Sequence, residues 1–247
     1  MKNQLRYLYR AWKYRVKLDK FEISTLRSRL KPGDMALDIG THKGAYTYWM
    51  AKATGPTGAV ISFEPQPKLA AYVKEATQAV GLRNVTVENL ALSNAAGKGT
   101  IVLPDDANGS PSPGAHLGSE SDSGIPVTCC RLDDYLENHK ARPVRFIKCD
   151  VEGHELEVFR GAESVLKNDH PVILFECEER HRKTPVSEVF EYLRSLGYAG
   201  WFISPNGLQS IDEFDSTIHQ AAEPGSETYI NNFLFEANTV GDAALAN

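Results

Sequence analysis

The chain has 247 residues, 42% of them hydrophobic and 24% charged, which is typical of a globular protein with one α/β domain. Its formal net charge is −5, but residues 1–20 hold seven Lys and Arg against one acid, which leaves 20 basic and 31 acidic residues in the body. An acidic body excludes a broad nucleic-acid-binding face, and no run of eighteen apolar residues exists to form a transmembrane helix.

Cysteine usage and the first residues indicate the compartment. Cys129 and Cys130 are adjacent, Cys149 and Cys177 lie in apolar runs, and none has zinc-ligand spacing. The N-terminal stretch carries charges where a signal peptide is apolar. We therefore expect reduced thiols and a cytoplasmic protein.

Residues 1–31 are predicted to form a basic helical extension. Its first helix is amphipathic, with apolar residues at helical spacing at Leu5, Leu8, Trp12 and Val16. A second helix over Glu22–Leu30 ends before the turn signal at residues 31–34. The apolar face is expected to pack on the main domain or on a sister subunit. Docking on an anionic membrane surface or on an acidic substrate is the alternative.

Residues 32–238 alternate between strand and helix patterns. The predicted strands are Met35–Gly40, Ala59–Pro65, Val85–Leu92, Thr100–Leu103, Val127–Arg131, Val144–Cys149 and Val172–Cys177. The predicted helices are Gly44–Ala53, Pro67–Val80, Leu132–His139, His154–Lys167 and Val186–Leu196. This alternation predicts an α/β, Rossmann-like fold with a mostly parallel sheet and helices on both faces.

Three segments depart from this rhythm. Residues 104–126 are rich in Gly, Pro, Ser and Asp and are predicted to be a flexible loop or lid. The strands Tyr198–Ile203 and Tyr229–Phe235 are predicted to form an antiparallel edge hairpin. Residues 239–247 are predicted to be a disordered tail.

The stretch DIGTHKG, residues 38–44, carries the first functional signal. It leaves the first strand and enters a helix, where open α/β sheets bind their ligands. Gly40 and Gly44 let the backbone turn sharply and let a ligand approach it. Glu64 ends the second strand, where a carboxylate can accept hydrogen bonds from both ribose hydroxyls. The pattern predicts a pocket for an adenosine whose ribose carries no phosphate.

Two residues in and before the glycine turn, His42 and Asp38, favour one cofactor. A dinucleotide fold usually has a glycine at the position of His42, where an imidazole would crowd a pyrophosphate. Asp38 suits the amino group of a methionine moiety and would repel a phosphate. The turn therefore favours S-adenosyl-L-methionine. The alternative for Asp38 and Glu64 is a helix-cap and turn role.

Four motifs resemble those of the FkbM-type methyltransferases and follow in the family's order: LDIGTHKGAYT, ISFEPQP, VTVENLALSN and FIKCDVEGHELEVFRGA. The resemblance extends from Met35 to Phe235. It implies a class I methyltransferase fold, S-adenosyl-L-methionine as methyl donor, and O-methylation of a sugar, a glycan or a polyketide-type natural product.

The resemblance also implies which residues bind the donor. The implied positions are Asp38, Gly40, Thr41, His42 and Gly44 at the methionine end, Glu64 at the ribose, and Asn89 and Ala91 near the adenine. Asp150 is implied to face the active centre. The chain departs from the usual first motif at His42 and Lys43, where Asn followed by an apolar residue is common. The N-terminal helix and the 104–126 loop also lie outside the shared pattern.

Acidic residues and one histidine follow two neighbouring strands. Asp150, Glu152 and His154 come after Val144–Cys149, and Glu176 lies near the end of the next strand. A hydroxyl acceptor must lose its proton, so we hypothesise that His154 or Asp150 is the general base. Glu152 and Glu176 would position the acceptor or a divalent cation. No metal site is predicted, because the D-x-E-x-H spacing is short and common. The alternative for Glu152 and His154 is capping of the following helix.

Two other functions share some of these features. An NAD-dependent oxidoreductase has the same glycine turn and distal carboxylate, but the chain offers no plausible Tyr-x-x-x-Lys pair for its chemistry. A non-catalytic Rossmann-like recognition module is the other alternative. We expect a small-molecule or glycan acceptor and no nucleic acid. Peripheral membrane contact through the N-terminal helix and a homodimer both stay open.

Overall fold

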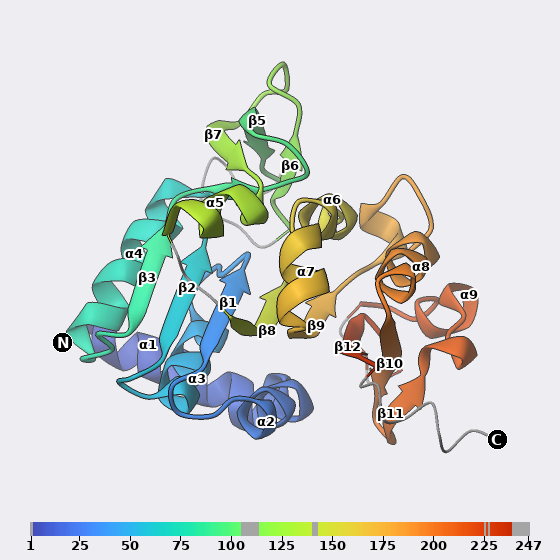
Figure 1. Ribbon diagram of the computed structural model, residues 1–247, viewed down its shortest axis with the longest axis horizontal. Coiled ribbons are helices and arrows are strands. Elements are labelled where there is room, and N and C mark those ends of the chain that lie inside the picture. The colour runs from blue at the N-terminus through green and yellow to red at the C-terminus, as the bar shows by residue number, and fades with distance from the viewer. Residues whose placement is uncertain (1, 105–113, 140–142, 225, 227, 239–247) are drawn as a thin grey trace.

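The structure is a computed structural model that describes residues 2–104, 114–139, 143–224, 226 and 228–238. Its main sheet has eight strands in the order β11-β10-β12-β9-β8-β1-β2-β3 (Figure 1). In chain order these are β1 (Met35–Ile39), β2 (Ala59–Phe63), β3 (Val85–Glu88), β8 (Val144–Cys149), β9 (Val172–Glu176), β10 (Tyr198–Ser204), β11 (Gly207–Ser210) and β12 (Asn232–Ala237). The first five are parallel and the last three join antiparallel, which confirms the predicted Rossmann-like, mostly parallel sheet.

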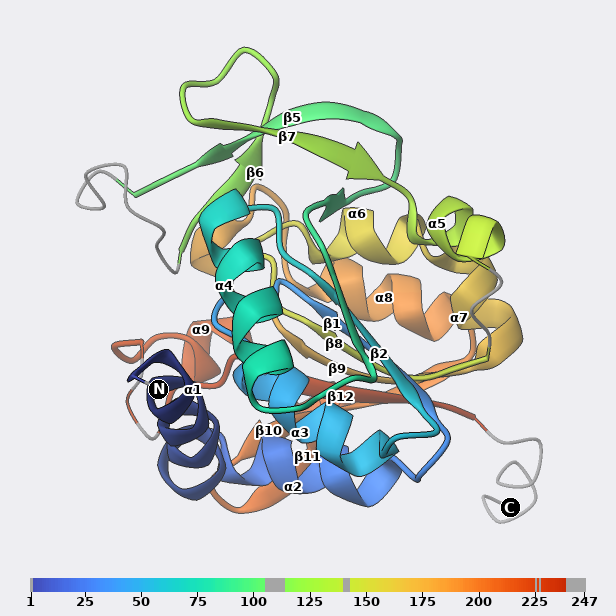
Figure 2. The ribbon, with the colours of Figure 1, turned by 90° about the vertical axis from the view of Figure 1, so that its left-hand side faces the viewer.

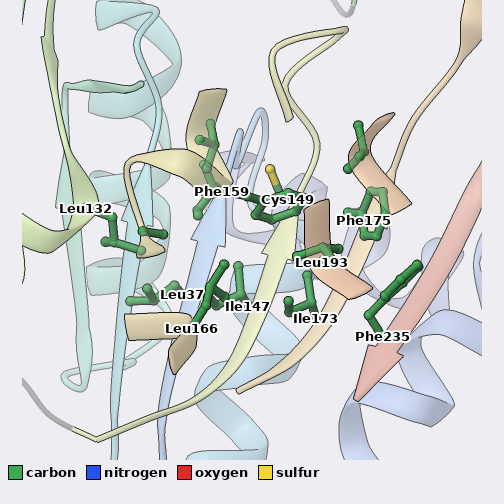
Figure 3. Close-up of a cluster of buried hydrophobic side chains, with 14 of the residues drawn as sticks. Leu37, Leu132, Ile147, Cys149, Phe159, Leu166, Ile173, Phe175, Leu193 and Phe235 are labelled. Carbon is green, nitrogen blue, oxygen red and sulfur yellow. The ribbon is translucent and has the colours of Figure 1, made fainter. Parts of the chain in front are cut away.

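Helices cover both faces of this sheet (Figure 2). One layer contains α1 (Lys2–Lys13), the π-helical turn η1 (Tyr14–Leu18), α2 (Lys20–Arg29), α3 (Ala45–Thr54) and α4 (Pro67–Ala79). The other contains α5 (Leu132–His139), α6 (Glu155–Arg160), α7 (Glu163–Asp169) and α8 (Ser187–Ser195). Because side chains alternate along a strand, each strand contributes side chains to both helical layers. Leu37, Ile147 and Ile173 from three adjacent strands pack in the cluster beneath α5–α8 (Figure 3).

A small second sheet sits beyond one end of the main sheet and was not predicted. The predicted strand Val85–Leu92 is divided, since β3 ends at Glu88 and Ala91–Leu92 forms β4. The second sheet has the order β4-β7-β5-β6, with β5 (Gly97–Val102), β6 (His116–Gly118) and β7 (Ile125–Cys130). The structure thus places β6 and the start of β7 within 104–126, where a loop was expected. Residues 105–113 of that prediction lie outside the described residues.

Two other predicted elements differ from the structure. The helix His154–Lys167 is divided into α6 and α7 at Gly161, where a Cβ would lie 2.0 Å from the Ser93 carbonyl oxygen. The last two predicted strands do pair antiparallel as β10 and β12, but β12 lies between β9 and β10. The edge strand is therefore β11, which was missed, and β10 and β11 form the hairpin. The predicted tail at 239–247 lies outside the described residues.

The N-terminal helix buries a different face from the one predicted. Tyr7 and Ala11 are fully buried, whereas Leu5, Trp12 and Val16 are exposed. The Trp49 Nε1–H of α3 donates to the Ala11 carbonyl oxygen at 2.8 Å, which fixes α1 against the main domain. Tyr7 packs edge-to-face on Tyr48 of α3, and Trp12, although half exposed, packs edge-to-face on Trp49. All four cysteines are free thiols. Within the described ranges, no helix is long and apolar enough to cross a membrane.

Candidate active site

Strand alternation places three charged side chains on one face of the sheet. Ala36, Phe146 and Leu174 pack in the cluster beneath α1–α4. Asp38, Lys148 and Glu176 each follow two residues later on the same three strands, so they face the same helical layer. Because β1, β8 and β9 are parallel, these residues gather at the carboxyl edge of the sheet, where open α/β folds bind ligands.

A cavity opens over these three side chains, and we name it the Lys148 cavity. Its volume is about 720 Å³, within the usual range of ligand sites. The sheet contributes Asp38, Lys148 and Glu176 to its lining, together with Asp150. The N-terminal segment closes the other side with Arg10, Tyr14, Lys17, Leu18, Asp19, Lys20, Phe21 and Glu22, and Tyr229, Asn231 and Asn232 complete it near β12. The lining is rich in carboxylates, amides and hydroxyls, the groups that bind polar ligands.

Lys148 is the buried cation of this cavity. Its Nζ lies 3.9 Å from Asp150 Oδ2 and 5.2 Å from the centre of the Tyr46 ring. Burial acts to lower the pKa of Lys148, but the carboxylates of Asp150 and Glu176 outweigh it and raise the pKa. Burial, followed by the charge of Asp150, raises the pKa of Glu176 well above its usual range. Lys148 therefore stays charged.

A second, more apolar cavity lies beside it, and we name it the Glu64 cavity. Its walls include Phe63, Leu90, Leu92, Ile101 and Leu117. The Glu64 carboxylate is buried and accepts hydrogen bonds from the backbone N–H of His42 at 2.7 Å and of Gln66 at 2.9 Å. Burial raises the pKa of Glu64 to about 7 despite these bonds. The cavity thus combines an apolar slot with one fixed carboxylate.

The two cavities meet at Gly40, His42 and Asp150, which line both. Gly40 has a φ of +78°, and a Cβ there would lie 1.8 Å from the Asp150 carbonyl oxygen, so only glycine allows this close approach. Burial lowers the pKa of His42 to about 4, so its ring is neutral. The buried His42 Nε2 has no hydrogen-bond partner among the described residues. A buried nitrogen of this kind is available to a ligand.

The structure brings most of the predicted donor-binding residues to these cavities. Asp38 and Thr41 line the Lys148 cavity, and Ala91 lines the Glu64 cavity. Burial raises the pKa of Asp38, whose Oδ2 accepts a hydrogen bond from Thr47 Oγ1 at 2.5 Å. The Asn89 side chain holds the loop after β2. Its Nδ2 donates hydrogen bonds to the carbonyl oxygens of Glu64 at 2.9 Å and Pro65 at 2.8 Å. Gly44 lies against the Tyr7 ring of α1, which a Cβ would approach to 2.9 Å.

The four predicted catalytic residues are divided between the cavities. Glu152 and His154 line the Glu64 cavity, Glu176 lines the Lys148 cavity and Asp150 lines both. His154 Nε2 is hydrogen-bonded to Ser93 Oγ at 2.9 Å, and its Nδ1 lies 3.8 Å from Glu157 Oε2. His154 occupies the N-cap position of α6 without a side-chain capping bond, contrary to the capping alternative.

Two contacts hold the Glu152 carboxylate in the wall of the Glu64 cavity. Its Oε1 accepts a hydrogen bond from the Gly114 backbone N–H at 3.0 Å, and its Oε2 lies 3.2 Å from His181 Nε2. Its φ is +52°, an uncommon conformation for a residue with a side chain. Burial, followed by the charge of Asp150, raises the pKa of Glu152 to about 7.

Sequence reasoning missed Lys148 and the N-terminal wall of its cavity. The available signal was a lysine inside the apolar strand VRFIKC, two residues before Asp150, where a buried strand has no solvent to receive it. Tyr14 and Asp19 also line this cavity, but no sequence pattern indicates it, because their position depends on how α1 and α2 fold back over the sheet. Among the described residues, no group of three or more His, Cys, Asp and Glu side chains is arranged to hold a metal ion.

Comparison with known proteins agrees with this architecture. The model of the methyltransferase FkbM domain matches residues 38–199. A crystal structure of methyltransferase FkbM from Methylobacillus flagellatus is similar at a TM-score of 0.53 and 14% identity, over 95% of this chain. A putative rRNA-methylase from Clostridium thermocellum is similar at a TM-score of 0.53 and 12% identity, over 88% of this chain and 94% of that one. At these identities the two structures show the fold alone.

A curated relative covers a shorter part of the chain. Protein-L-isoaspartate O-methyltransferase from Ignicoccus hospitalis is 40% identical over 60 residues, or 24% of this chain. This chain spans only 28% of that relative and 55% of the Methylobacillus protein. The FkbM model, in contrast, matches well over half of the chain and includes both Asp38 and Lys148. The chain therefore belongs to the FkbM methyltransferase family, with the Rossmann-like fold of that class.

Proposed function

We propose that this protein transfers a methyl group from S-adenosylmethionine to a hydroxyl of a sugar, a glycan or a polyketide-type natural product. The observation that carries the proposal is the meeting of the two cavities at Asp150. One cavity suits a nucleoside and the other suits a polar acceptor. A group that lines both can act on the acceptor at the point where the methyl group arrives.

The Glu64 cavity fits the adenosine part of the donor. Phe63, Leu92 and Ile101 offer apolar contact to an adenine ring, and the buried Glu64 carboxylate can accept hydrogen bonds from the ribose hydroxyls. Asp38 lies on the other side of Gly40, where its carboxylate can receive the amino group of the methionine part. The unpartnered His42 Nε2 lies between them. His42 stands where a dinucleotide fold needs a glycine beside the pyrophosphate, which argues against the oxidoreductase alternative.

The Lys148 cavity fits a hydroxyl-rich acceptor. Asp150 and Glu176 can accept hydrogen bonds from hydroxyls, and the amides of Asn231 and Asn232 can both accept and donate. Such a lining favours a sugar or glycan over an apolar molecule.

The chain's own residues supply positioning, a base and a cation. When bound, S-adenosylmethionine supplies a methyl group already activated by its sulfonium. The acceptor hydroxyl is held in the Lys148 cavity in line with that group, and Asp150 takes the hydroxyl proton. The Lys148 ammonium stabilises the negative charge that develops on the acceptor oxygen. The bound donor would supply the methyl carbon to this oxygen, and the electron pair of the broken carbon–sulfur bond would stay on the sulfur of the product S-adenosylhomocysteine.

Geometry favours Asp150 over His154 as the base. Asp150 faces the acceptor cavity, whereas the His154 ring lines the nucleoside side and is engaged by Ser93. Burial lowers the pKa of His154, so its ring is neutral and could act as a base only if it reached the acceptor.

A product search tests the proposed function. The protein is incubated with methyl-labelled S-adenosylmethionine and a cell extract separated into aqueous, glycan and lipid fractions. We expect a new methyl ether, and we expect Asp150→Asn to reduce its formation by about 100-fold or more while S-adenosylhomocysteine still binds. A label found on nitrogen or carbon, or an unchanged rate in Asp150→Asn, would contradict the proposal.

A further inference from the structure

The first helix has two apolar faces, and only one of them is covered. Tyr7 and Ala11 face α3 and are fully buried. On the other side, Leu5 is 64%, Tyr9 71% and Val16 55% exposed. These residues recur at helical spacing, so they form one outward strip. We define the N-terminal apolar strip as Leu5, Tyr9, Trp12 and Val16; Leu18 and Phe21, also exposed, follow in the π-helical turn and α2.

This concentration of exposed apolar side chains is local. Elsewhere in the described ranges, the large hydrophobic residues that are exposed are Leu208 and Ile218, far from the strip in the sequence. Scattered single residues of that kind are normal on a protein surface, whereas a contiguous strip marks an interaction site.

Positive charge accompanies the strip. Arg6, Lys13, Lys17 and Lys20 are exposed on the same segment, and no ion pair joins them to a carboxylate of the described residues. Residues 1–20 carry seven basic residues against one acid, although the whole chain has a net charge of −5. Positive charge is therefore concentrated on the segment that bears the strip, where it can attract an anionic partner.

The same segment forms the rim of the acceptor cavity. Lys17, Leu18, Lys20 and Phe21, which follow the last strip residue Val16 directly in the chain, line the Lys148 cavity. A surface that bound the strip would therefore lie next to the cavity through which an acceptor enters. Figure 2 shows α1 on the outside of the α3 layer, where such a surface can approach.

We propose that the N-terminal apolar strip docks the protein on an anionic lipid bilayer and presents the Lys148 cavity to an acceptor held in that bilayer. An apolar strip flanked by Lys and Arg suits the interface of a bilayer, where rings and aliphatic groups enter the headgroup boundary and cations meet anionic headgroups. A second copy of the chain suits it less, because a twofold contact would bring the same basic residues face to face. The docking is inferred from the strip and its flanking charges alone. The location of the acceptor in the bilayer depends, in addition, on the proposed function.

Vesicle flotation with the full-length protein tests the docking. The vesicles contain phosphatidylcholine alone or with phosphatidylglycerol. We expect the protein to float with the anionic vesicles, to float less as salt rises, and to remain unbound with phosphatidylcholine alone. Each basic residue near the surface contributes about fivefold in partition, so Arg6→Glu with Lys13→Glu should reduce binding by about 25-fold or more. Leu5→Glu with Tyr9→Glu should also abolish flotation.

The control makes the same two kinds of change elsewhere on the surface. Ile218→Glu with Lys98→Glu alters an exposed apolar residue and an exposed lysine outside the strip, and it should float like the unchanged protein. Affinity for S-adenosylhomocysteine confirms that each variant is folded. Absence of flotation, or equal flotation of the strip variants, would overturn the proposal. So would a dimer in light scattering that the strip variants dissociate while no vesicles bind. Flotation needs no methyl transfer, so failure of docking is distinguishable from failure of the proposed function.

Discussion

At the scale of single residues, Lys148 sets the charge balance of its cavity. Its ammonium is surrounded by Asp150, Glu176 and Asp19, whose carboxylates raise its pKa. A buried cation among several buried acids costs solvation free energy, and removing it leaves those acids without compensation. Such an arrangement is retained where it serves binding or catalysis, which is the role that the mechanism gives to Lys148.

We predict that Lys148→Met lowers methyl transfer by about 100-fold or more, because the charge that develops on the acceptor oxygen loses its cation. Methionine keeps a similar volume, so the affinity for S-adenosylhomocysteine should stay close to that of the unchanged protein. The measurements are the rate of label transfer and calorimetry. Lys98→Met, at an exposed position on β5, is the matched control and should be silent. Equal loss of donor binding would point instead to a disturbed fold.

Donor binding is predicted to depend on pH through Glu64. The pKa of this carboxyl is raised to about 7 by burial, and ribose hydroxyls donate to its ionised form. Below pH 7 the group must lose a proton before it accepts both bonds, so affinity should fall by up to about tenfold per pH unit. Above pH 7 the affinity should level off. Calorimetric titration of S-adenosylhomocysteine across this range is the measurement, and Glu64→Gln should bind more weakly with a flat profile. A sloping profile in Glu64→Gln would assign the dependence to another group, such as Glu152.

A residue's place in the candidate site could be predicted from the sequence where its position at the end of a strand was enough to locate it. Asp38 and Glu64 follow from polar residues at the ends of apolar strands, and the structure places both in the cavities. His154 could not be judged in the same way, because its partner Ser93 lies 61 residues earlier and is brought near only by the second sheet. Lys148 was overlooked because its neighbours in the strand are apolar.

At the scale of elements, local patterns gave the bounds of isolated helices and strands. Residues 132–139 and 144–149 fold as predicted, since their periodicity and capping signals are contained in a few residues. Strands were predicted at 100–103 and 127–131, where β5 and β7 lie, but their pairing into a second sheet was missed because it joins distant residues such as Ala91 and Cys129. The start of β5, Gly97-Lys98-Gly99, was missed as well. Short strands rich in glycine have little pattern of their own.

The turn after β1 is predicted to depend on the absence of a side chain at Gly40. Gly40→Ala should destabilise the fold by about 3 kcal/mol or more, because a Cβ would collide with the Asp150 carbonyl oxygen and φ is positive. Gly81→Ala is a matched control, with a φ of +79° and nothing within 4 Å of its Cβ. It should cost only about 1–2 kcal/mol. Urea unfolding measures both, and equal losses would show that backbone strain, not the contact with Asp150, is responsible.

At the scale of the whole molecule, the ends of the chain complete a domain whose family motifs lie between them. The matched region spans residues 38–199, yet α1 and α2 cover one face of the sheet and β12 lies inside it. The N-terminal segment therefore has two sides with different tasks. Its inner side belongs to the core and closes the Lys148 cavity, and its outer side is the apolar strip.

This division predicts opposite effects for two tyrosines on the same helix. Tyr7 is fully buried against α3, so Tyr7→Ala should lower the free energy of unfolding by about 3–5 kcal/mol through lost burial and the cavity left behind. Tyr9 is 71% exposed, so Tyr9→Ala should change stability by less than about 0.5 kcal/mol while weakening vesicle binding. Urea unfolding and flotation are measured on both variants. If Tyr7→Ala were as stable as Tyr9→Ala, α1 would be a detachable arm, and neither the closed Lys148 cavity nor the fixed orientation of the strip beside it could hold.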